Sequence, residues 1–354
     1  MADSKQKKVL FILGSMGRGG AERVISILSR DFANNGWLTQ IGLLLFNKVD
    51  YSLDDSTQIF NFTGNANSRT LRVPYWLYKI RNCVKKEKPD YIVSFAARIN
   101  ILVLLATLGL HVKVIVSERN DPMQDGRGFI TRCMVRLLYP IAEKIVFQTK
   151  RSLRYFPKKI LQKGVVIPNP ISVPCYASSE KKKKIVSVGR LTKQKNHALL
   201  INAFASIKKD YPEYELFIYG DGELREDLVS LARSLNVEKN VHFEGNIPNI
   251  HEKIADADLF VLSSNYEGLS NALLEALMMG LPCVATNVAG VDEYIINDIN
   301  GKIVPVGDET ALADAIKVCL DNKSIRDSFA INARIDAKSF DKQKVLEKWN
   351  SIME

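Results

Sequence analysis

The chain has 354 residues, of which 46% are hydrophobic and 25% charged, a composition that excludes a disordered protein and predicts two domains of roughly 150–180 residues. No apolar run reaches the ~18 residues of a membrane-spanning helix, and the run at residues 9–14 is too short for a signal peptide, so we expect a cytosolic protein. Residues 1–170 carry 27 Lys and Arg against 12 Asp and Glu (net +15), and residues 171–354 carry 22 against 27 (net −5), which predicts an anionic partner for the first half.

In the first half, short apolar segments alternate with amphipathic ones. Strands are predicted at residues 9–13, 38–46, 91–95, 112–116, 144–147 and 165–167. Residues 21–32 have the spacing of a helix, and the run at 101–110 is typical of a buried helix. Three prolines at 168, 170 and 174 and the basic run at 181–184 then predict a linker.

The alternation restarts in the second half. Strands are predicted at residues 185–188, 216–219, 241–243, 259–262, 282–285 and 302–304. Helices are predicted at 196–208, 223–235, 310–320, 324–338 and 342–352, and a further one follows the segment at 265–270.

This order predicts the fold class. Alternating strands and helices are typical of parallel sheets covered by helices on both faces. Two successive sets predict an α/β protein with two Rossmann-like domains, residues 1–170 and 171–340, whose parallel sheets face an interdomain cleft. Ligands of such sheets bind at the carboxyl ends of the strands.

Glycines follow the first strand in the segment Gly14-Ser15-Met16-Gly17-Arg18-Gly19-Gly20-Ala21-Glu22-Arg23. Glycine lets backbone approach a ligand closely, although a tight structural turn is the alternative reading. The spacing is a poor G-x-G-x-x-G, and the second predicted strand ends in Phe46-Asn47-Lys48 without an acidic residue. Both features argue against a dinucleotide cofactor.

The second half carries cations and glycines at strand ends. Gly189, Arg190 and Lys195 follow its first strand, where two cations could neutralise a diphosphate; a surface pair is the alternative. Gly220-Asp221-Gly222-Glu223 and the segment containing Asn246 and Ile247 follow the next two strands. These turns could shape a base pocket, with backbone near Ile247 reading the base, although each alone is ordinary turn chemistry.

The most informative segment places two carboxylates, Glu267 and Glu275, around the turn Gly268-Leu269-Ser270-Asn271. Ser270 is a good helix cap, so a helix is predicted to begin there. The unpaired amides and the dipole of a helix start favour an anion. The segment therefore offers amides for phosphate and carboxylates for hydroxyls, the set that a nucleotide diphosphate-sugar needs.

Metal-binding patterns are weak. Asp256-Ala257-Asp258 resembles a metal motif but leads directly into the strand at 259–262, at the end away from the ligand face. No spacing of the five cysteines or four histidines fits zinc or a disulfide framework. We therefore expect no metal and no other cofactor, and cysteines that are reduced: Cys83, Cys133, Cys175, Cys283 and Cys319.

Taken together, these segments resemble the family 4 retaining glycosyltransferases of GT-B fold. The resemblance covers nearly the whole chain and is carried by Gly19-Gly20-Ala21-Glu22-Arg23, Val188-Gly189-Arg190-Leu191 with Lys195-Asn196, Gly220-Asp221-Gly222-Glu223-Leu224, and the Glu267–Glu275 block. It points to bacterial surface-polysaccharide or lipid-linked oligosaccharide transferases that move a hexose or N-acetylhexosamine. It implies a UDP-sugar donor, no bound metal, and a last helix, residues 341–354, that packs on the first domain.

The resemblance also implies roles. Glu275 is expected to accept hydrogen bonds from the ribose, and Glu267 to contact hydroxyls of the donor sugar. The donor diphosphate is expected to meet backbone amides and two cations, at Gly268, Leu269, Ser270, Asn271, Arg190 and Lys195. Gly19 and Gly20 are expected to close over the same phosphates. Glu267, Arg190 and Lys195 are the predicted catalytic residues.

One segment departs from the family. Related sequences often carry a His after the strand at 112–116, where this chain reads Ser117-Glu118-Arg119-Asn120-Asp121-Pro122. Arg119 and Asn120 are the candidates for that place, and with Arg98 they are the acceptor-side candidates. The identity of the sugar, the acceptor and the linkage stay open.

The basic first half, together with the resemblance, suggests an acceptor at an anionic membrane and peripheral binding at its inner face. A solubilising face is the alternative reading. The basic residues form two clusters: Arg69, Arg72, Lys79, Arg81, Lys85, Lys86 and Lys88, then Arg127, Arg132, Arg136, Lys150, Arg151, Arg154, Lys158 and Lys159.

Two other functions stay open. One is a GT-B sugar-nucleotide epimerase or phosphorylase, which incubation with donor alone would expose. The other is a non-enzymatic nucleic-acid or lipid-binding scaffold, against which the basic residues are not interleaved with base-stacking aromatics. We therefore expect no nucleic-acid partner.

Overall fold

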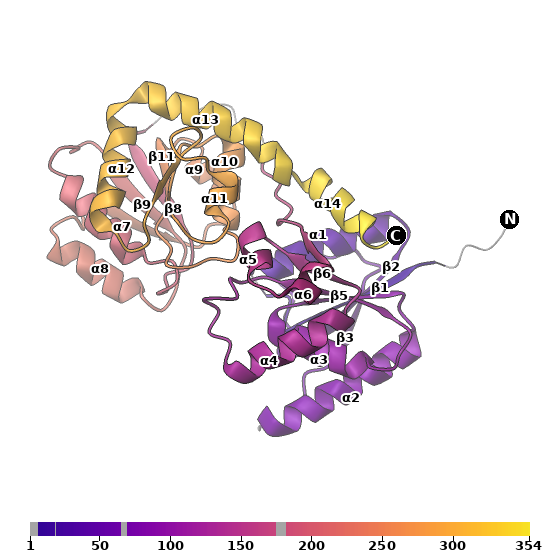
Figure 1. The fold of residues 1–354 in the computed structure, drawn as a ribbon. Coiled ribbons are helices and arrows are strands. Elements are labelled where there is room, and N and C mark those ends of the chain that lie inside the picture. The colour runs from indigo at the N-terminus through magenta and orange to yellow at the C-terminus, as the bar shows by residue number, and fades with distance from the viewer. Residues whose placement is uncertain (1–5, 18, 65–68, 175–181) are drawn as a thin grey trace. The chain divides into compact units, whose positions relative to one another are not determined.

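The computed structural model describes residues 6–17, 19–64, 69–174 and 182–354, with backbone alone at 69–71 (Figure 1). Arg18, Cys175, Lys181 and the side chain of Arg69 lie outside the described part. The chain divides into two compact units, which we call unit 1 (Met1–Pro170 with Gln343–Glu354) and unit 2 (Ile171–Lys342).

Unit 1 contains a seven-stranded parallel sheet with the order β3-β2-β1-β4-β5-β6-β7. The chain leaves the middle of the sheet in both directions, which is the doubly wound arrangement. Its strands are β1 (Lys8–Leu13), β2 (Leu38–Leu43), β3 (Gln58–Asn61), β4 (Tyr91–Phe95), β5 (Lys113–Glu118), β6 (Lys144–Phe147) and β7 (Gly164–Val166). The edge strand β3 is not predicted, because its four residues are mostly exposed and lack a buried alternating face.

Helices cover both faces of this sheet. Leu102, Val103 and Tyr139 belong to the core on one face, whereas Ile25, Leu28 and other residues of α1 pack on the opposite face. The helices are α1 (Gly20–Asn34), α2 (Arg69–Glu87), α3 (Ala97–Thr107), α4 (Phe129–Leu138), the 3-10 turn η1 (Tyr139–Ile141), α5 (Lys150–Arg154), α6 (Lys158–Leu161) and α14 (Lys342–Ser351).

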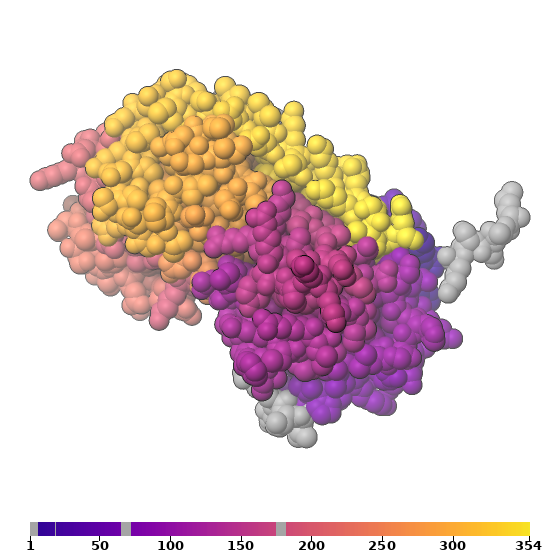
Figure 2. Space-filling model, in the orientation of Figure 1, coloured from indigo at the N-terminus to yellow at the C-terminus, as the bar shows by residue number. Residues whose placement is uncertain are grey.

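The C-terminal helix α14 supplies part of the unit 1 core. Val345, Leu346 and Trp349 are buried with the residues of α1, and the Trp349 ring stacks 6.3 Å from Phe95 at the end of β4. Figure 2 shows the C-terminal end of the chain, in yellow, lying against the rest of unit 1. Because the aromatic side chains are fully enclosed, the last helix is an integral part of this unit.

Unit 2 contains a six-stranded parallel sheet with the order β10-β9-β8-β11-β12-β13. Its strands are β8 (Lys184–Val188), β9 (Glu215–Tyr219), β10 (Val241–Gly245), β11 (Leu259–Leu262), β12 (Cys283–Thr286) and β13 (Lys302–Val304). Its helices are α7 (His197–Ile207), α8 (Arg225–Ser234), α9 (Ile250–Ile254), α10 (Asn271–Met279), α11 (Val291–Tyr294), α12 (Glu309–Asp321), α13 (Lys323–Ala337) and the turn η2 (Lys338–Phe340).

Two separate hydrophobic cores lie on the two faces of the unit 2 sheet. Phe204 of α7 and Ile316 of α12 belong to one core, and Leu274 of α10 and Ala333 of α13 belong to the other. Both units are therefore parallel sheets between helical layers, which confirms the predicted α/β class with two Rossmann-like units.

Candidate functional site

The predicted donor-site residues of unit 2 follow the carboxyl ends of four neighbouring strands. Gly189 comes directly after β8, Gly220 after β9, Asn246 after β10, and the loop with Glu267 lies between β11 and α10. This edge of a doubly wound sheet is where ligands bind.

Glu267 is held by several hydrogen bonds at this edge, with only 5% of its surface exposed. Its Oε1 accepts hydrogen bonds from Lys195 Nζ at 2.5 Å and from Ser264 Oγ at 2.7 Å. Its Oε2 accepts from Gln194 Nε2 at 3.3 Å. These contacts fix the carboxylate, while its remaining lone pairs leave acceptor capacity for a ligand.

Glycines make the approach of these loops possible. A Cβ on Gly189 would lie 3.1 Å from the Lys195 side chain, so this glycine makes room for the lysine. Gly220 has φ +135°, and a Cβ there would lie 2.0 Å from the carbonyl oxygen of Gly189. The loops after β8 and β9 can therefore touch only because position 220 has no side chain.

The helix α10 begins where the sequence predicts a cap. The Ser270 side chain accepts a hydrogen bond from the Leu273 amide at 3.4 Å, and Asn271 is the first helical residue. Gly268 and Leu269 precede this cap in a buried loop. The amides of the first helical turn are thus oriented as an anion site requires.

Glu275 lies within α10 and is 6% exposed. Its Oε2 lies 2.9 Å from Nε2 of His251 on α9, a residue that the sequence did not single out. His251 belongs to no recognisable sequence motif. Its contact with Glu275 is therefore apparent only in the folded structure.

The other donor-side candidates have fewer contacts. Arg190 and Asn246 are exposed, and Arg190 forms no ion pair with a residue that the structure describes. Ile247 is half-buried against the core that contains α10. Arg190 is thus a cation available at the carboxyl edge of unit 2.

The buried His197 follows this cluster at the start of α7. Burial, reinforced by the positive charge of Lys195, lowers the pKa of His197 to about 3. The ring is therefore neutral at physiological pH, which avoids a second buried cation beside Lys195.

In unit 1, the glycines that follow β1 lie at the start of the helix α1. Gly19 is the N-cap of α1 and Gly20 its first residue. A Cβ on Gly19 would lie 2.2 Å from Oε2 of Glu22, so the absence of a side chain lets that carboxylate fold back over the helix start. The Gly19 carbonyl accepts a hydrogen bond from the Tyr51 hydroxyl at 3.0 Å.

The acceptor-side candidates differ in environment. Arg98, in the first turn of α3, and Asn120 are exposed. Arg119 follows β5, its Nη1 donates to Asn169 Oδ1 at 2.7 Å, and its guanidinium carbon lies 4.3 Å from the centroid of the Phe95 ring. Burial lowers the pKa of Arg119 to about 9, an effect that the charge of Glu22 opposes.

A buried polar network next to Arg119 corrects one prediction. Arg127 is only 5% exposed, and its Nη2 donates to Glu118 and to Asp125, each at 2.6 Å. Tyr139 donates to the same Glu118 carboxylate. Hydrogen bonds from Arg127 to Asp125 and the charge of Glu118 raise its pKa despite burial. Arg127 therefore does not belong to a basic surface, because its charge is neutralised inside unit 1.

Asp256 and Asp258 precede β11, at the amino end where the sequence placed them. Asp256 pairs with Lys182 and Lys184, and Asp258 lies 3.6 Å from Arg326. Among the described residues, no group of three or more His, Cys, Asp or Glu side chains is arranged to hold a metal ion.

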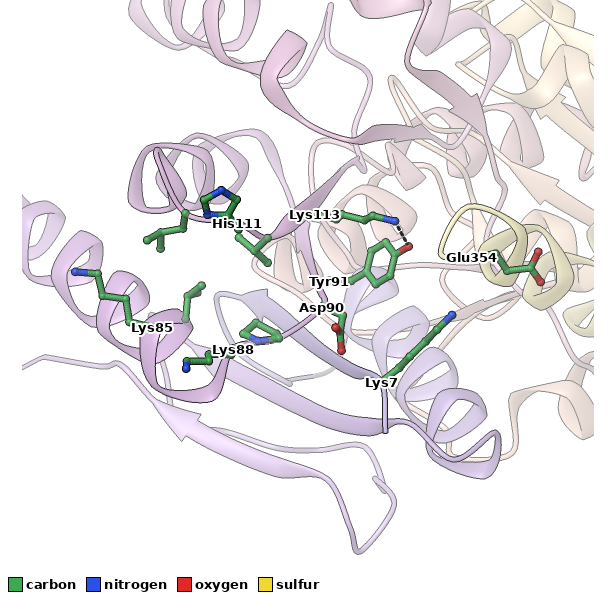
Figure 3. A pocket seen from close by; sticks show the side chains of 12 residues that line it. Lys7, Lys85, Lys88, Asp90, Tyr91, His111, Lys113 and Glu354 are labelled. Carbon is green, nitrogen blue, oxygen red and sulfur yellow. Dashed lines mark hydrogen bonds between the residues drawn. The ribbon is translucent and has the colours of Figure 1, made fainter. Parts of the chain in front are cut away.

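A hollow of about 810 Å³ lies at the opposite, amino-terminal edge of the unit 1 sheet (Figure 3). Lys113, at the start of β5, donates to the Tyr91 hydroxyl at 2.9 Å inside it. Its charged lining residues are Lys7, Lys85, Lys88, Asp90, Lys113 and Glu354. The hollow is basic, and it lies at the edge of the unit 1 sheet opposite the carboxyl end of β5, which Arg119 follows.

Comparison with known families and proteins gives consistent results. Residues 174–336 match the family described as Glycosyl transferases group 1. The chain is 30% identical to N-acetylgalactosamine-N,N'-diacetylbacillosaminyl-diphospho-undecaprenol 4-alpha-N-acetylgalactosaminyltransferase of Campylobacter jejuni, over 96% of this chain and 97% of the relative. It is 25% identical, over 98% of both chains, to a second Campylobacter jejuni enzyme, a GalNAc-alpha-(1->4)-GalNAc-alpha-(1->3)-diNAcBac-PP-undecaprenol alpha-1,4-N-acetyl-D-galactosaminyltransferase.

Solved structures share the fold. Anabaena Alr3699/HepE in complex with UDP and glucose has a TM-score of 0.82 at 18% identity, covering 98% of this chain and 99% of that one. The lipopolysaccharide outer core galactosyltransferase WaaB has a TM-score of 0.78 at 19% identity, covering 98% and 99%. These similarities confirm the predicted GT-B fold.

Proposed function

Because the chain belongs to the Glycosyl transferases group 1 family, we propose that it transfers a hexose or N-acetylhexosamine from a UDP-sugar to a lipid-linked glycan. The family shows glycosyltransferase activity, as the resemblance predicted, and the names of the relatives support a place in bacterial polysaccharide assembly. The donor and acceptor are our proposal. The lipid-linked acceptor is supported by the diphospho-undecaprenol in the name of the Campylobacter jejuni relative.

The observation that carries the proposal is the cluster of Glu267, Lys195 and the α10 start at one sheet edge of unit 2. Cleaving a glycosyl–phosphate bond leaves negative charge on the diphosphate. Lys195, Arg190 and the amides after Ser270 would stabilise that charge as it develops. The buried Glu275, held in α10, would accept hydrogen bonds from the ribose.

We base our proposals for the stereochemistry of transfer and for its metal requirement on the same cluster. Retention through a covalent intermediate needs a carboxylate nucleophile, and we assign no second carboxylate to that role. We therefore propose front-face transfer with retention, in which the leaving phosphate helps to deprotonate the acceptor. We also propose that no metal is needed, because protein cations and helix amides would meet the charge of the diphosphate. A product of inverted configuration by NMR, or activity abolished by EDTA, would contradict these proposals.

The first experiment is a thermal-shift panel of nucleotide diphosphate-sugars. We expect one UDP-sugar to stabilise the protein and Glu275→Ala to lose this shift. The matched control is Glu226→Ala, which removes an exposed carboxylate from α8. If the wild type shows no shift with any nucleotide, the donor assignment fails.

We further propose that the protein binds peripherally to the anionic inner face of the cell membrane. No helix in the described part of the chain is both long and apolar enough to span a bilayer. The helix α4 instead exposes Phe129 (81%), Ile130 (78%) and Leu137 (68%). Arg132 and Arg136 are exposed beside them, three and seven residues after Phe129. Exposed apolar side chains flanked by arginines are typical of helices that lie in a membrane interface.

A further inference from the structure

One edge of the Arg119 guanidinium has no hydrogen-bond partner among the residues that the structure describes. Nη1 is used by Asn169, whereas Nε and Nη2 are buried and make no hydrogen bond with any residue in the described part of the chain. Nε and Nη2 share one edge of the planar group. That edge can donate two parallel hydrogen bonds to two oxygens of one phosphate or carboxylate.

The surroundings hold this edge in place. The ring of Phe95 supports one face of the guanidinium, and Asn169 Oδ1 accepts a second hydrogen bond at 2.7 Å from Gln148 Nε2. The Oε1 atom of Gln148 is buried and has no hydrogen-bond partner in the described ranges of the chain. Arg119, Gln148 and Asn169 follow the neighbouring strands β5, β6 and β7, so they line the carboxyl edge of the unit 1 sheet.

The electrostatics favour an anion at the unpaired edge of Arg119. Burial destabilises the charged form of Arg119, and yet a guanidinium remains protonated at neutral pH. Buried donors without partners are rare in folded proteins, and an unpaired buried cation is costly. Glu118, the preceding carboxylate, does not serve as the partner because it is engaged by Arg127 and Tyr139. The charge of Glu22 favours the protonated guanidinium, but no described residue, Glu22 included, accepts a hydrogen bond from Nε or Nη2.

We propose that the Nε/Nη2 edge of Arg119 binds two oxygens of a substrate phosphate group. This inference rests on the proposed function, whose donor and lipid-linked acceptor each carry a diphosphate. The chemistry of the contact is the same for both. Arg119 is then a substrate-binding residue of unit 1 that takes a phosphate in a fork.

The test compares Arg119→Lys with the wild type by calorimetry. Lysine keeps the positive charge but cannot present a fork. The three probes are UDP, inorganic pyrophosphate, and a short-chain prenyl diphosphate carrying one N-acetylhexosamine. The matched control is Arg30→Lys, because Arg30 is an exposed arginine of α1 that contacts Ser52.

We expect at least one probe to bind Arg119→Lys more than about tenfold more weakly, with Arg30→Lys within twofold of wild type. Weaker binding of UDP alone assigns the donor diphosphate, and weaker binding of the prenyl compound alone assigns the acceptor. Unchanged dissociation constants for all three probes, or no binding of any probe to the wild type, would overturn the inference. If the wild type binds the prenyl compound or pyrophosphate but not UDP, only the donor assignment fails.

Folding of each variant is checked by its thermal melt. If Arg119→Lys does not fold, Arg119→Gln is judged by the same criterion, since glutamine supplies a neutral donor for the Asn169 contact. A purely structural role for Arg119 would lower the melting temperature and leave the dissociation constants of the folded protein unchanged.

Discussion

Lys195 Nζ lies 2.5 Å from Glu267 Oε1, although the two residues are 72 positions apart in the chain. Both side chains are largely buried, so each holds the other in position at the carboxyl edge of the unit 2 sheet. The pair joins a cation suited to a phosphate with a carboxylate suited to a sugar hydroxyl.

Glu267→Gln tests this pair. We expect transfer to fall roughly 10²-fold or more, because the neutral amide accepts a hydrogen bond from a sugar hydroxyl more weakly than the carboxylate does. UDP affinity should change by less than about threefold, since the phosphate ligands remain. Steady-state rates and calorimetry of Glu267→Gln, beside Glu226→Gln as control, measure both quantities. Normal turnover by Glu267→Gln would contradict the assigned role.

His251→Ala tests the contact between His251 and Glu275. Loss of one hydrogen bond to a carboxylate should weaken UDP binding by about 1.5–3 kcal/mol, or roughly 10- to 150-fold. The ribose gives a specific readout, because removing its hydroxyls from the ligand should cost less affinity in His251→Ala than in the wild type. Titrations with UDP and its 2′,3′-dideoxy analogue form that cycle. Rescue by His251→Gln is expected, and equal costs in both proteins would exclude the contact.

His197 predicts a pH dependence of stability. In the folded protein the pKa of His197 is about 3, below the ordinary 6.5. The contribution of His197 to the free energy of unfolding is therefore present above pH 6.5 and is lost as the pH falls toward 3. At pH 5 the loss is about 2 kcal/mol. Urea unfolding of the wild type and His197→Gln at pH 7 and pH 5 measures it. His197→Gln should lack this component of the pH dependence, whereas the exposed-site control His111→Gln should retain it.

Gly220→Ala tests the approach of two loops in unit 2. The added Cβ would clash with the Gly189 carbonyl at a strained φ, so we expect a loss of about 3 kcal/mol or more and no UDP binding. The control is Gly245→Ala, at φ +69° with no atom within 4 Å of the added Cβ. It should cost only about 1–2 kcal/mol. Equal melting temperatures for the two variants would contradict the clash.

Binding to vesicles tests the α4 surface. Replacing Arg132 and Arg136 together by Gln should weaken binding to anionic vesicles by about 2 kcal/mol, or roughly 30-fold, because each basic side chain near the surface contributes about 1 kcal/mol. The control replaces Arg233 and Lys239, two exposed cations of unit 2, by Gln. Sedimentation with anionic and with neutral vesicles measures both variants. Binding that persists unchanged in high salt would exclude the electrostatic contribution.

Much of the fold could be read from local patterns. The strands at Tyr91–Phe95 and Lys144–Phe147 end where the apolar runs end, because a buried parallel strand is a continuous apolar segment. The edge strand Gln58–Asn61 escaped prediction, because three of its four residues are exposed and a half-solvated edge leaves no periodic signal.

The amino-acid sequence alone was enough to predict the α/β class, the strand ends that Gly189 and Gly220 follow, the loop that carries Glu267, and the cap at Ser270. It could do so because helix starts and strand ends depend on neighbouring residues, and parallel alternation brings every carboxyl end of a strand to one edge. The side chains that meet across that edge could be identified only in the folded protein. Lys195 with Glu267, His251 with Glu275, the burial of Arg127 and the unpaired edge of Arg119 all depend on packing between distant segments, which no local pattern contains.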